Sequence, residues 1–259
     1  IQKLPKWLRP AALLYWNVRT ALLYLAHRIV GGPSFGFHEP QTDESLALGV
    51  KYAYRCEVEG DIAEFGTMSG TTAATIAKTM AEVQDGPGGS AYPPKRLHLF
   101  DSFKGLPKPE SPVDKESPHV RSGVWQEGTC FVLSKDDLRG VCSKFLDEDR
   151  IVLHEGWFRD TLPKLGPGAK FSMLHIDCDL YESTVDVLDY CFARALPQEG
   201  AVVFFDDWDD NRASPRFGER KAWSEAVEKF SIVCSEGREY GVAGKKFIVH
   251  SYKGMRREP

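Results

Sequence analysis

The sequence predicts an α/β protein with a mostly parallel sheet and helices on both faces. Short runs with strand character alternate five times with helical segments between residues 62 and 230, and such alternation is typical of parallel strands joined by helices. The run from Ala201 to Phe205 is apolar throughout, as expected for a strand buried on both faces. Two more strands, separated by glycines, follow it. We therefore expect a seven-stranded sheet with an antiparallel C-terminal strand.

Local sequence features explain where several of the predicted helices and turns begin. Thr42 and Ser134 can cap the helices that follow them. Gly66 and Gly70 allow a tight turn between the first strand and its helix. The predicted strands cover residues 62–65, 96–100, 151–154, 171–176, 201–205, 231–235 and 245–251. The predicted helices after the N-terminal region cover residues 42–54, 71–82, 134–145, 183–195 and 218–230.

The composition is that of a globular protein and gives physical grounds against some partners. Hydrophobic residues make up 42% of the 259 positions, and the net charge is −4. One large domain with decorations is therefore expected, and nucleic acid is not expected as a partner. The six cysteines are scattered without a C-x-x-C pair. This pattern indicates reduced thiols in the cytoplasm and not a disulfide framework or a zinc site.

Residues 1–55 are predicted to form a helical extension that contacts the substrate or another subunit, and residues 56–259 the main domain. Two apolar stretches, 11–16 and 20–26, are separated by Asn17 and Arg19. A membrane-spanning helix needs roughly 20 consecutive apolar residues, so we expect no stable membrane insertion and no signal peptide. The extension can lie on a membrane surface or pack against protein. We expect the second arrangement, in a homo-oligomer.

The segment 103–125 is predicted to be a lid-like loop. It contains four prolines, at positions 107, 109, 112 and 118, and many charged residues. It is long for a connection within a compact domain, and such loops often close over an active site.

The first predicted strand ends in the string Glu64-Phe-Gly-Thr-Met-Ser-Gly70. This pattern differs from the G-x-G-x-x-G of dinucleotide-binding proteins. An acid at this position favours a ligand with a cationic part, and S-adenosylmethionine has both an ammonium and a sulfonium group. Asp101, after the second strand, can accept hydrogen bonds from two ribose hydroxyls. The alternative is that Asp101 stabilises a turn.

Carboxylates follow the fourth and fifth predicted strands. Asp177 and Asp179 come after the strand at 171–176, and they can point the same way if the chain stays extended. Asp206 and Asp207 follow the strand that should be its neighbour. Three carboxylates at such an edge favour Mg²⁺, Ca²⁺ or Mn²⁺ over zinc. The alternative for residues 206–210 is a solvated acidic turn.

Two other side chains near these acids have structural interpretations. His175 lies within the fourth strand, and we interpret it as a packed core histidine. Cys178 lies between two aspartates, and we interpret it as a small buried side chain.

Five strings of the sequence resemble the macrocin O-methyltransferase family, the TylF, MycF and NovP group of S-adenosylmethionine-dependent enzymes. The most specific are those at residues 156–163 and 177–184. In chain order, the strings are Gly60-Asp-Ile-Ala-Glu-Phe-Gly66, Asp101-Ser-Phe-Lys-Gly-Leu-Pro107, Gly156-Trp-Phe-Arg-Asp-Thr-Leu-Pro163, Asp177-Cys-Asp-Leu-Tyr-Glu-Ser-Thr184 and Asp206-Asp-Trp208. The chain departs from the family's pattern in the loop 209–220 and in the N-terminal region, so the family's substrates do not carry over.

The resemblance implies a Rossmann-like class I methyltransferase fold and site residues with assigned roles. It implies Mg²⁺, or another divalent metal that prefers oxygen, held by Asp177, Asp206 and Asp207, with Asp179 as the general base. It also implies cofactor contacts at a set of residues at the strand ends: Glu64, Gly66, Thr67, Ser69, Asp101, Ser102, Gly156, Trp157 and Asp177.

The activity implied is Mg²⁺-dependent transfer of a methyl group from S-adenosylmethionine to a hydroxyl of a sugar or glycosylated natural product, as in antibiotic biosynthesis. A surface-bound enzyme acting on a glycolipid is a variant of this activity. Two alternatives remain open. One is a catechol-type methyltransferase acting on a phenolic hydroxyl, and the other is a non-catalytic α/β protein that binds a nucleoside and a metal.

Overall fold

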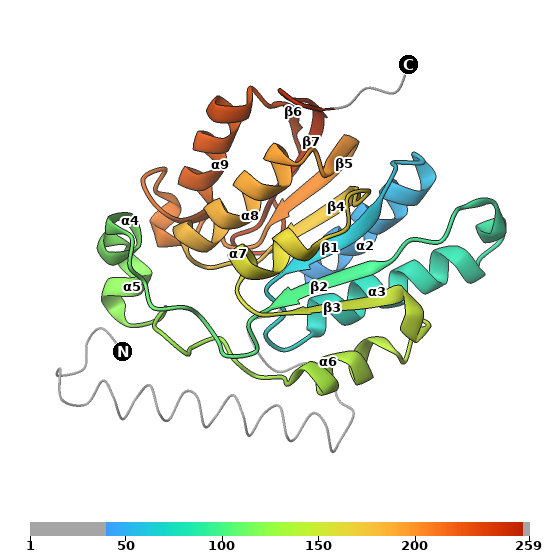
Figure 1. Cartoon of the computed structure of the whole chain (residues 1–259), viewed down its shortest axis with the longest axis horizontal. Helices are drawn as coiled ribbons and strands as arrows, with labels where there is room; N and C mark the ends of the chain where they lie inside the picture. The colour runs from blue at the N-terminus through green and yellow to red at the C-terminus, as the bar shows by residue number, and fades with distance from the viewer. Residues whose placement is uncertain (1–39, 256–259) are drawn as a thin grey trace.

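The computed structural model describes residues 40–255, which form a seven-stranded sheet in the order β3-β2-β1-β4-β5-β7-β6 (Figure 1). The first five strands are parallel, whereas β7 is antiparallel to both β5 and β6. The predicted fold class is therefore confirmed, as is the adjacency of β4 and β5. The strands are β1 (Asp61–Phe65), β2 (Leu97–Asp101), β3 (Ile151–Glu155), β4 (Phe171–Ile176), β5 (Pro197–Phe205), β6 (Val233–Glu236) and β7 (Lys245–Ser251).

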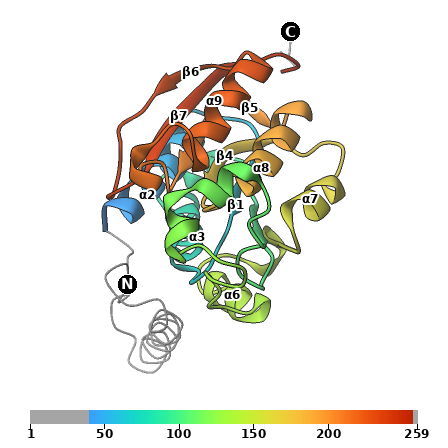
Figure 2. The same cartoon turned by 90° about the vertical axis from the view of Figure 1, so that its left-hand side faces the viewer.

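Helices cover both faces of the sheet (Figures 1 and 2). One face carries α2 (Pro40–Arg55), α3 (Thr71–Asp85) and α6 (Lys135–Cys142), and the other carries α7 (Phe158–Thr161), α8 (Tyr181–Ala193) and α9 (Gly218–Phe230). Two short helices, α4 (Pro112–Glu116) and α5 (Pro118–Ser122), lie beyond the carboxyl ends of the strands. The described residues also form four short 3-10 helices: η2 (Gly89–Ala91), η3 (Glu148–Arg150), η4 (Leu162–Lys164) and η5 (Asn211–Ala213).

The structure differs from the sequence-based elements mainly in the segment 103–125. Two of the prolines that suggested an irregular loop, Pro112 and Pro118, occupy the first turns of α4 and α5. Proline suits this position because its missing N–H would have no partner within the helix. Ser111 and Ser117 cap the two helices by accepting backbone N–H groups. The segment is therefore partly helical, while its role as a lid stays a prediction.

The N-terminal region is only partly covered by the structure. The part of the predicted helical extension that precedes residue 40 lies outside the described residues. The described part of the predicted extension, α2, contributes Leu46, Val50 and Tyr54 to the core, each at most 1% exposed. The division of the chain after residue 55 stays a prediction, but the helix that precedes it packs directly on the sheet.

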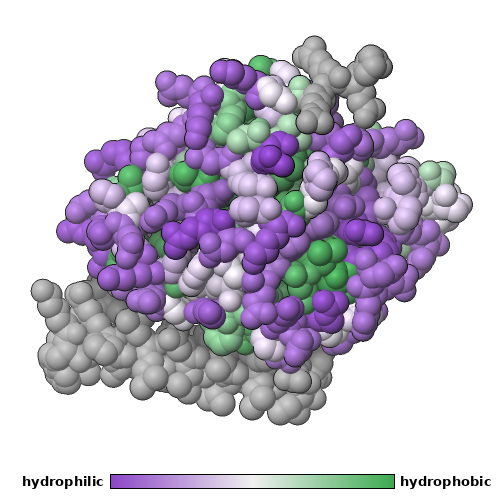
Figure 3. Space-filling model, in the orientation of Figure 1, coloured by the Kyte–Doolittle hydropathy of each residue, from purple (hydrophilic) through white to green (hydrophobic). Residues whose placement is uncertain are grey.

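The face of the molecule drawn in Figure 3 is mainly hydrophilic. Figure 3 shows polar residues over most of the face that carries α8 and α9, with apolar residues in separate groups. Within residues 40–255, no helix is long and apolar enough to cross a membrane.

Close packing between α2 and β5 depends on a glycine. A Cβ added to Gly49 would lie 2.5 Å from the Phe204 ring. Because this ring is buried in the core, the Gly49→Ala variant should lose about 1–3 kcal/mol of unfolding free energy through overpacking. The matched control is Gly140→Ala in α6, where a Cβ would meet nothing within 4 Å. That control should gain roughly 0.5–1 kcal/mol from helix propensity. Urea unfolding measures both, and a Gly49→Ala variant as stable as the wild type would contradict this packing argument.

Candidate active site

The predicted site residues gather at one edge of the sheet because the parallel strands end there together. Phe65 is in register with Ile176, and Ile176 is in register with Phe205. The residues that follow these partners, among them Gly66, Asp177 and Asp206, therefore come next to one another. Such an edge is where open α/β sheets bind ligands.

The turn after β1 requires glycine for reasons of space. Gly66 has φ = +91°, and a Cβ there would lie 1.9 Å from the carbonyl oxygen of Asp177. Gly70, with φ = +70°, immediately precedes α3 and packs against the side chain of Leu133. Between them, the Ser69 hydroxyl lies 2.9 Å from that of Thr71. The two glycines thus let the first turn of α3 approach the end of β4.

Asp101 links the ends of β1 and β2. Its Oδ2 accepts hydrogen bonds from the backbone N–H and the hydroxyl of Thr67, both at 2.8 Å, and its Oδ1 accepts the N–H of Phe103 at 2.7 Å. Ser102 continues this turn by donating to the carbonyl oxygen of Gly105 at 2.8 Å. Asp101 therefore stabilises a turn. Each carboxylate oxygen has more than one acceptor site, so binding of ribose hydroxyls stays a prediction.

The turn after β3 joins the same edge. The N–H of Gly156 donates to the carbonyl oxygen of Asp101 at 2.9 Å. The backbone of Gly156 has φ = +134°, a conformation that favours glycine. Trp157 then caps α7, with its carbonyl oxygen accepting the N–H of Asp160 and the N–H of Thr161. The structure thus places both residues beside the predicted cofactor residues of β2.

Asp177, Asp179 and Asp207 each offer an oxygen that lies within 4.8 Å of the others. Asp179 does not reach this cluster through an extended chain, since β4 ends at Ile176 and Asp179 has φ = +59°. Aspartate tolerates this left-handed conformation better than most residues. The Asp179 N–H donates to Asp207 Oδ2 at 3.1 Å, so the turn itself brings the two acids together.

Burial and mutual repulsion perturb these acids. Burial raises the pKa of Asp177 well above its usual range, and nearby Asp206 adds to the effect. Burial likewise raises the pKa of Asp207, with Asp179 adding to it. Burial raises the pKa of Asp179 to about 7, although a hydrogen bond from the Cys130 thiol lowers this pKa in part. Carboxyl groups that lie close together with raised pKa values are stabilised either by a shared proton or by a bound cation.

A second chain of buried groups runs beneath the cluster. His175 is fully buried, which confirms its interpretation as a core histidine, and its Nδ1 lies 2.9 Å from Glu64 Oε1. Its Nε2 lies 3.8 Å from Asp206 Oδ1. Burial lowers the pKa of His175, but the carboxylates of Asp206 and Glu64 outweigh burial and raise it well above its usual range. Asp206 thus faces His175, while Asp179 joins the other two acids.

Cys178 also matches its structural interpretation. It is 3% exposed, belongs to the core on the α8 side of the sheet, and directs its thiol to the carbonyl oxygen of Phe65 at 3.7 Å. It is one of six free cysteines.

Sequence reasoning missed Glu219, at the start of α9. This side chain is 1% exposed, and its Oε2 accepts the N–H of Asp207 at 3.0 Å. In the sequence it resembles any acid in the first turn of a helix. Only the packing of α9 against the end of β5 reveals its position.

The segment 103–125 is anchored to α8 by a carboxylate that sequence reasoning also missed. Asp114 is 1% exposed, and it accepts the N–H of Tyr181 at 2.8 Å and that of Glu182 at 3.1 Å. Helix α8 has no side-chain cap at its own N-cap residue, Leu180. Asp114 therefore caps the helix that begins at Tyr181, two residues after Asp179.

A second anchor joins this segment to the loop after β5. The backbone N–H of His119 donates to Asn211 Oδ1, and the N–H of Asn211 donates to His119 Nδ1, both at 3.0 Å. Asn211, Arg212 and Ala213 all have positive φ, between 52° and 63°. Non-glycine residues keep such a conformation only where contacts hold it. The segment 103–125 thus supports both loops that carry the acids.

The clustered donors suit the divalent metal implied by the sequence, with Asp179 where Asp206 was predicted. The clustered ligand atoms are carboxylate oxygens, which magnesium-like cations prefer. Among the described residues, Glu64 Oε2 and Glu219 Oε1 are buried without a hydrogen-bond partner. Buried carboxylate oxygens without partners are unfavourable, and a cationic ligand would satisfy them.

The sheet order, with an antiparallel β7 and a ligand edge after β1, β4 and β5, defines a class I methyltransferase fold. Residues 44–234 match the model of the macrocin-O-methyltransferase (TylF) family, and the chain belongs to that family. The structure also resembles the O-methyltransferase NovP, with 23% identity and a TM-score of 0.64, covering 85% of this chain and 84% of that one. It resembles the calicheamicin methyltransferase CalS11 with 25% identity and a TM-score of 0.60, covering 80% and 77%.

Curated relatives are similar over part of their length. A 4'-O-methyltransferase of a rhamnosyl-tetracenomycin C from Streptomyces olivaceus is 31% identical over 58% of this chain and 54% of its own length. Mycinamicin III 3''-O-methyltransferase from Micromonospora griseorubida is 28% identical over 61% and 59%, respectively. The chain thus spans little more than half the length of these relatives.

The cap on α8 can be tested by mutation. Asp114→Ala should lower the unfolding free energy by about 1–2 kcal/mol, because two buried N–H groups lose their acceptor, and it should speed proteolysis within residues 103–125. The control is Glu116→Ala in the same short helix, whose side chain is 71% exposed and whose loss should change stability by less than about 0.5 kcal/mol. Equal stability and cleavage rates for the two variants would show that Asp114 does not anchor the segment.

Proposed function

We propose that this protein is an S-adenosylmethionine-dependent O-methyltransferase that acts on a hydroxyl of a sugar or glycosylated natural product and requires Mg²⁺ or a similar cation. The observation that carries the proposal is the group of carboxylates beside the glycine turn of β1, in a chain of this family. The relatives named above methylate tetracenomycin and mycinamicin compounds according to their names. The rhamnosyl group in the first of these names supports the acceptor class proposed here.

Cofactor binding is proposed at the ends of β1, β2 and β3. Glu64 has a buried oxygen without a partner, which suits the ammonium group of S-adenosylmethionine. Asp101 would accept hydrogen bonds from the ribose hydroxyls. The remaining cofactor contacts are proposed at residues of the turns after these strands: Thr67, Ser69, Ser102, Gly156 and Trp157.

Asp177, Asp206 and Asp207 are proposed to hold the cation. A bound Mg²⁺ would stabilise negative charge on the acceptor oxygen. Asp206 faces His175 in this structure, and Asp179 lies with the other two acids. Asp179 is therefore within reach of the same site and is free of a backbone-capping role for its carboxylate.

Asp179 is proposed to take the proton from the acceptor hydroxyl. Methyl transfer needs the oxygen, the methyl carbon and the sulfur in line, and a hydroxyl is a weak nucleophile until it loses its proton. The raised pKa of Asp179, about 7, suits a group that accepts a proton near neutral pH. The anchored segment 103–125 would exclude water from this step as a lid.

A cytoplasmic location and a homo-oligomeric state are also part of the proposal. The free state of all six cysteines supports the location.

Calorimetry and activity assays test this function together. S-adenosylhomocysteine should bind to the purified protein. Methyl transfer from labelled S-adenosylmethionine to a panel of rhamnosylated natural products should stop in EDTA and return when Mg²⁺ is added. Methylation of catechol alone would favour the phenol-directed alternative. If neither S-adenosylmethionine nor S-adenosylhomocysteine binds, the protein is not this enzyme. Full activity in EDTA would remove the metal from the proposal.

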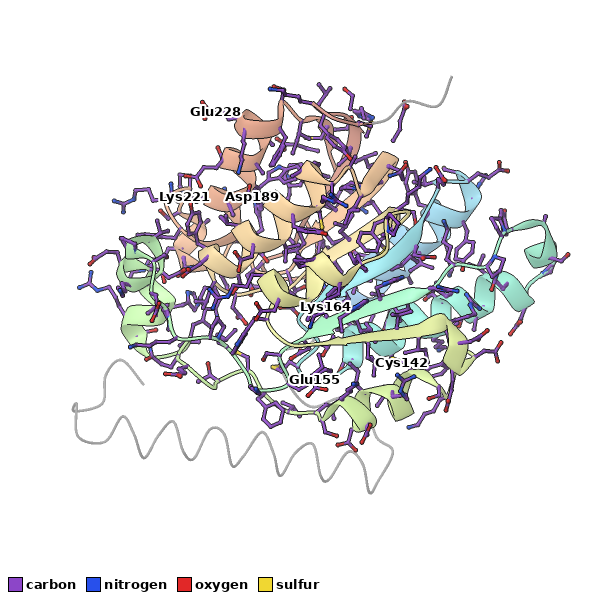
Figure 4. All side chains as sticks on the ribbon, in the orientation of Figure 1. Cys142, Glu155, Lys164, Asp189, Lys221 and Glu228 are labelled. Carbon is purple, nitrogen blue, oxygen red and sulfur yellow. The ribbon has the colours of Figure 1, made fainter. Side chains whose placement is uncertain are left out.

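Replacement of the proposed base should affect chemistry but not cofactor binding. Asp179→Asn should lower kcat by about 10²–10⁴-fold while S-adenosylhomocysteine binds as in the wild type. The control is Asp189→Asn, on the outer surface of α8 (Figure 4), where the carboxylate pairs with Lys229 at 2.8 Å.

The same assignment predicts a pH profile. Because Asp179 must be deprotonated to act, wild-type kcat/KM should fall as the pH decreases, with a midpoint at or below about 7. Near-wild-type turnover by Asp179→Asn would rule out this residue as the base.

A further inference from the structure

Glu219 occupies a position behind the proposed cation site that the proposed mechanism does not use. It is the second residue of α9, and it reaches back to the end of β5, where its Oε2 accepts the Asp207 N–H at 3.0 Å. This bond fixes the backbone of Asp207 and with it the start of the loop that carries two of the acids. One oxygen of Glu219 therefore has a clear structural role.

The second oxygen has no such role. Among the described residues, Glu219 Oε1 is buried and accepts no hydrogen bond. The next residue, Arg220, does not neutralise it, since Arg220 Nε donates to the carbonyl oxygen of Trp208 at 2.8 Å and its guanidinium pairs with Asp209. A side chain whose only task is to accept one N–H group would not need a second buried oxygen, because a buried oxygen without a partner costs free energy.

The electrostatic neighbours of Glu219 are the acids of the site. Glu219 Oε2 is bonded to the backbone of Asp207, and Asp207 lies with Asp177 and Asp179 in the acid cluster. In its ionised form, the side chain adds negative charge beside these three acids. A cation bound among these acids would be attracted by Glu219 as well, without direct coordination.

We propose that Glu219 is a positioning residue of the cation site, which holds the Asp207 backbone with one oxygen and strengthens the binding of a divalent cation with the charge of the other. This inference rests on the proposed metal site at Asp177, Asp206 and Asp207. It adds a fourth acid, supplied by α9, that supports the cation from outside the ligand cluster.

Metal titration without substrate or cofactor tests the proposal. Mg²⁺ and Mn²⁺ are titrated calorimetrically into wild type, Glu219→Gln, Glu219→Asp and a matched control, Glu228→Gln. Glu228 is an exposed acid near the other end of α9 (Figure 4). Glu219→Gln keeps a carbonyl oxygen that can accept the Asp207 N–H but removes the charge. Its Kd for Mg²⁺ should rise about 10-fold or more, Glu219→Asp should recover part of the loss, and Glu228→Gln should bind as the wild type does.

Thermal unfolding in EDTA separates this effect from simple loss of structure. Glu219→Gln should unfold at the same or a higher temperature than the wild type, because one like charge is removed. If its Tm in EDTA is lower, we compare how much Mg²⁺ raises the Tm of each protein above that protein's own value in EDTA. A rise in Glu219→Gln equal to the rise in the wild type overturns the inference. Equal Mg²⁺ affinity of Glu219→Gln and wild type also overturns it.

The wild-type titration distinguishes failure of this inference from failure of the proposed function. If the wild type binds no divalent cation but binds S-adenosylhomocysteine, the metal site and the role of Glu219 both fail, while the methyltransferase proposal stands without metal. If the wild type binds Mg²⁺ and Glu219→Gln binds it equally well, only the role of Glu219 fails.

Discussion

Mutual repulsion among half-buried carboxylates is the constraint on which the rest of this structure depends. Asp177, Asp179 and Asp207 come close enough for a single small cation to touch all three, and burial raises the pKa of each. Such groups separate unless the surrounding chain holds them. The turns after β4 and β5 must therefore be fixed by contacts from elsewhere in the molecule, and three different parts of the chain supply them.

The contacts come from both faces of the sheet and from its carboxyl edge. The glycine turn after β1 packs against the backbone of Asp177. Helix α9 holds Asp207 through Glu219. The segment 103–125 caps α8 through Asp114 and engages the loop after β5 through His119. Because these supports come from separate elements, they hold the turns that carry the acids from several directions.

The same supports keep the acids that follow β4 and β5 in different surroundings. Asp206 is turned towards the buried pair of His175 and Glu64, whereas Asp179 is carried by a left-handed turn whose N–H bonds Asp207. Two acids that follow adjacent strands thus have different surroundings. Groups with similar intrinsic acidity acquire different roles when their environments differ in this way.

The sequence by itself determined the strand order along the chain, the adjacency of β4 and β5, and the edge where the acids meet. Alternation, glycine turns and strand-end acids are local signals, and the parallel sheet converts them into neighbours. Only the tertiary structure revealed Glu219 and Asp114, because an acid near a helix start has the same local pattern whether it faces solvent or a distant backbone. The turn at Asp179 was also decided there, since its positive φ depends on Asp207, a residue that reaches it through the packing of β4 against β5.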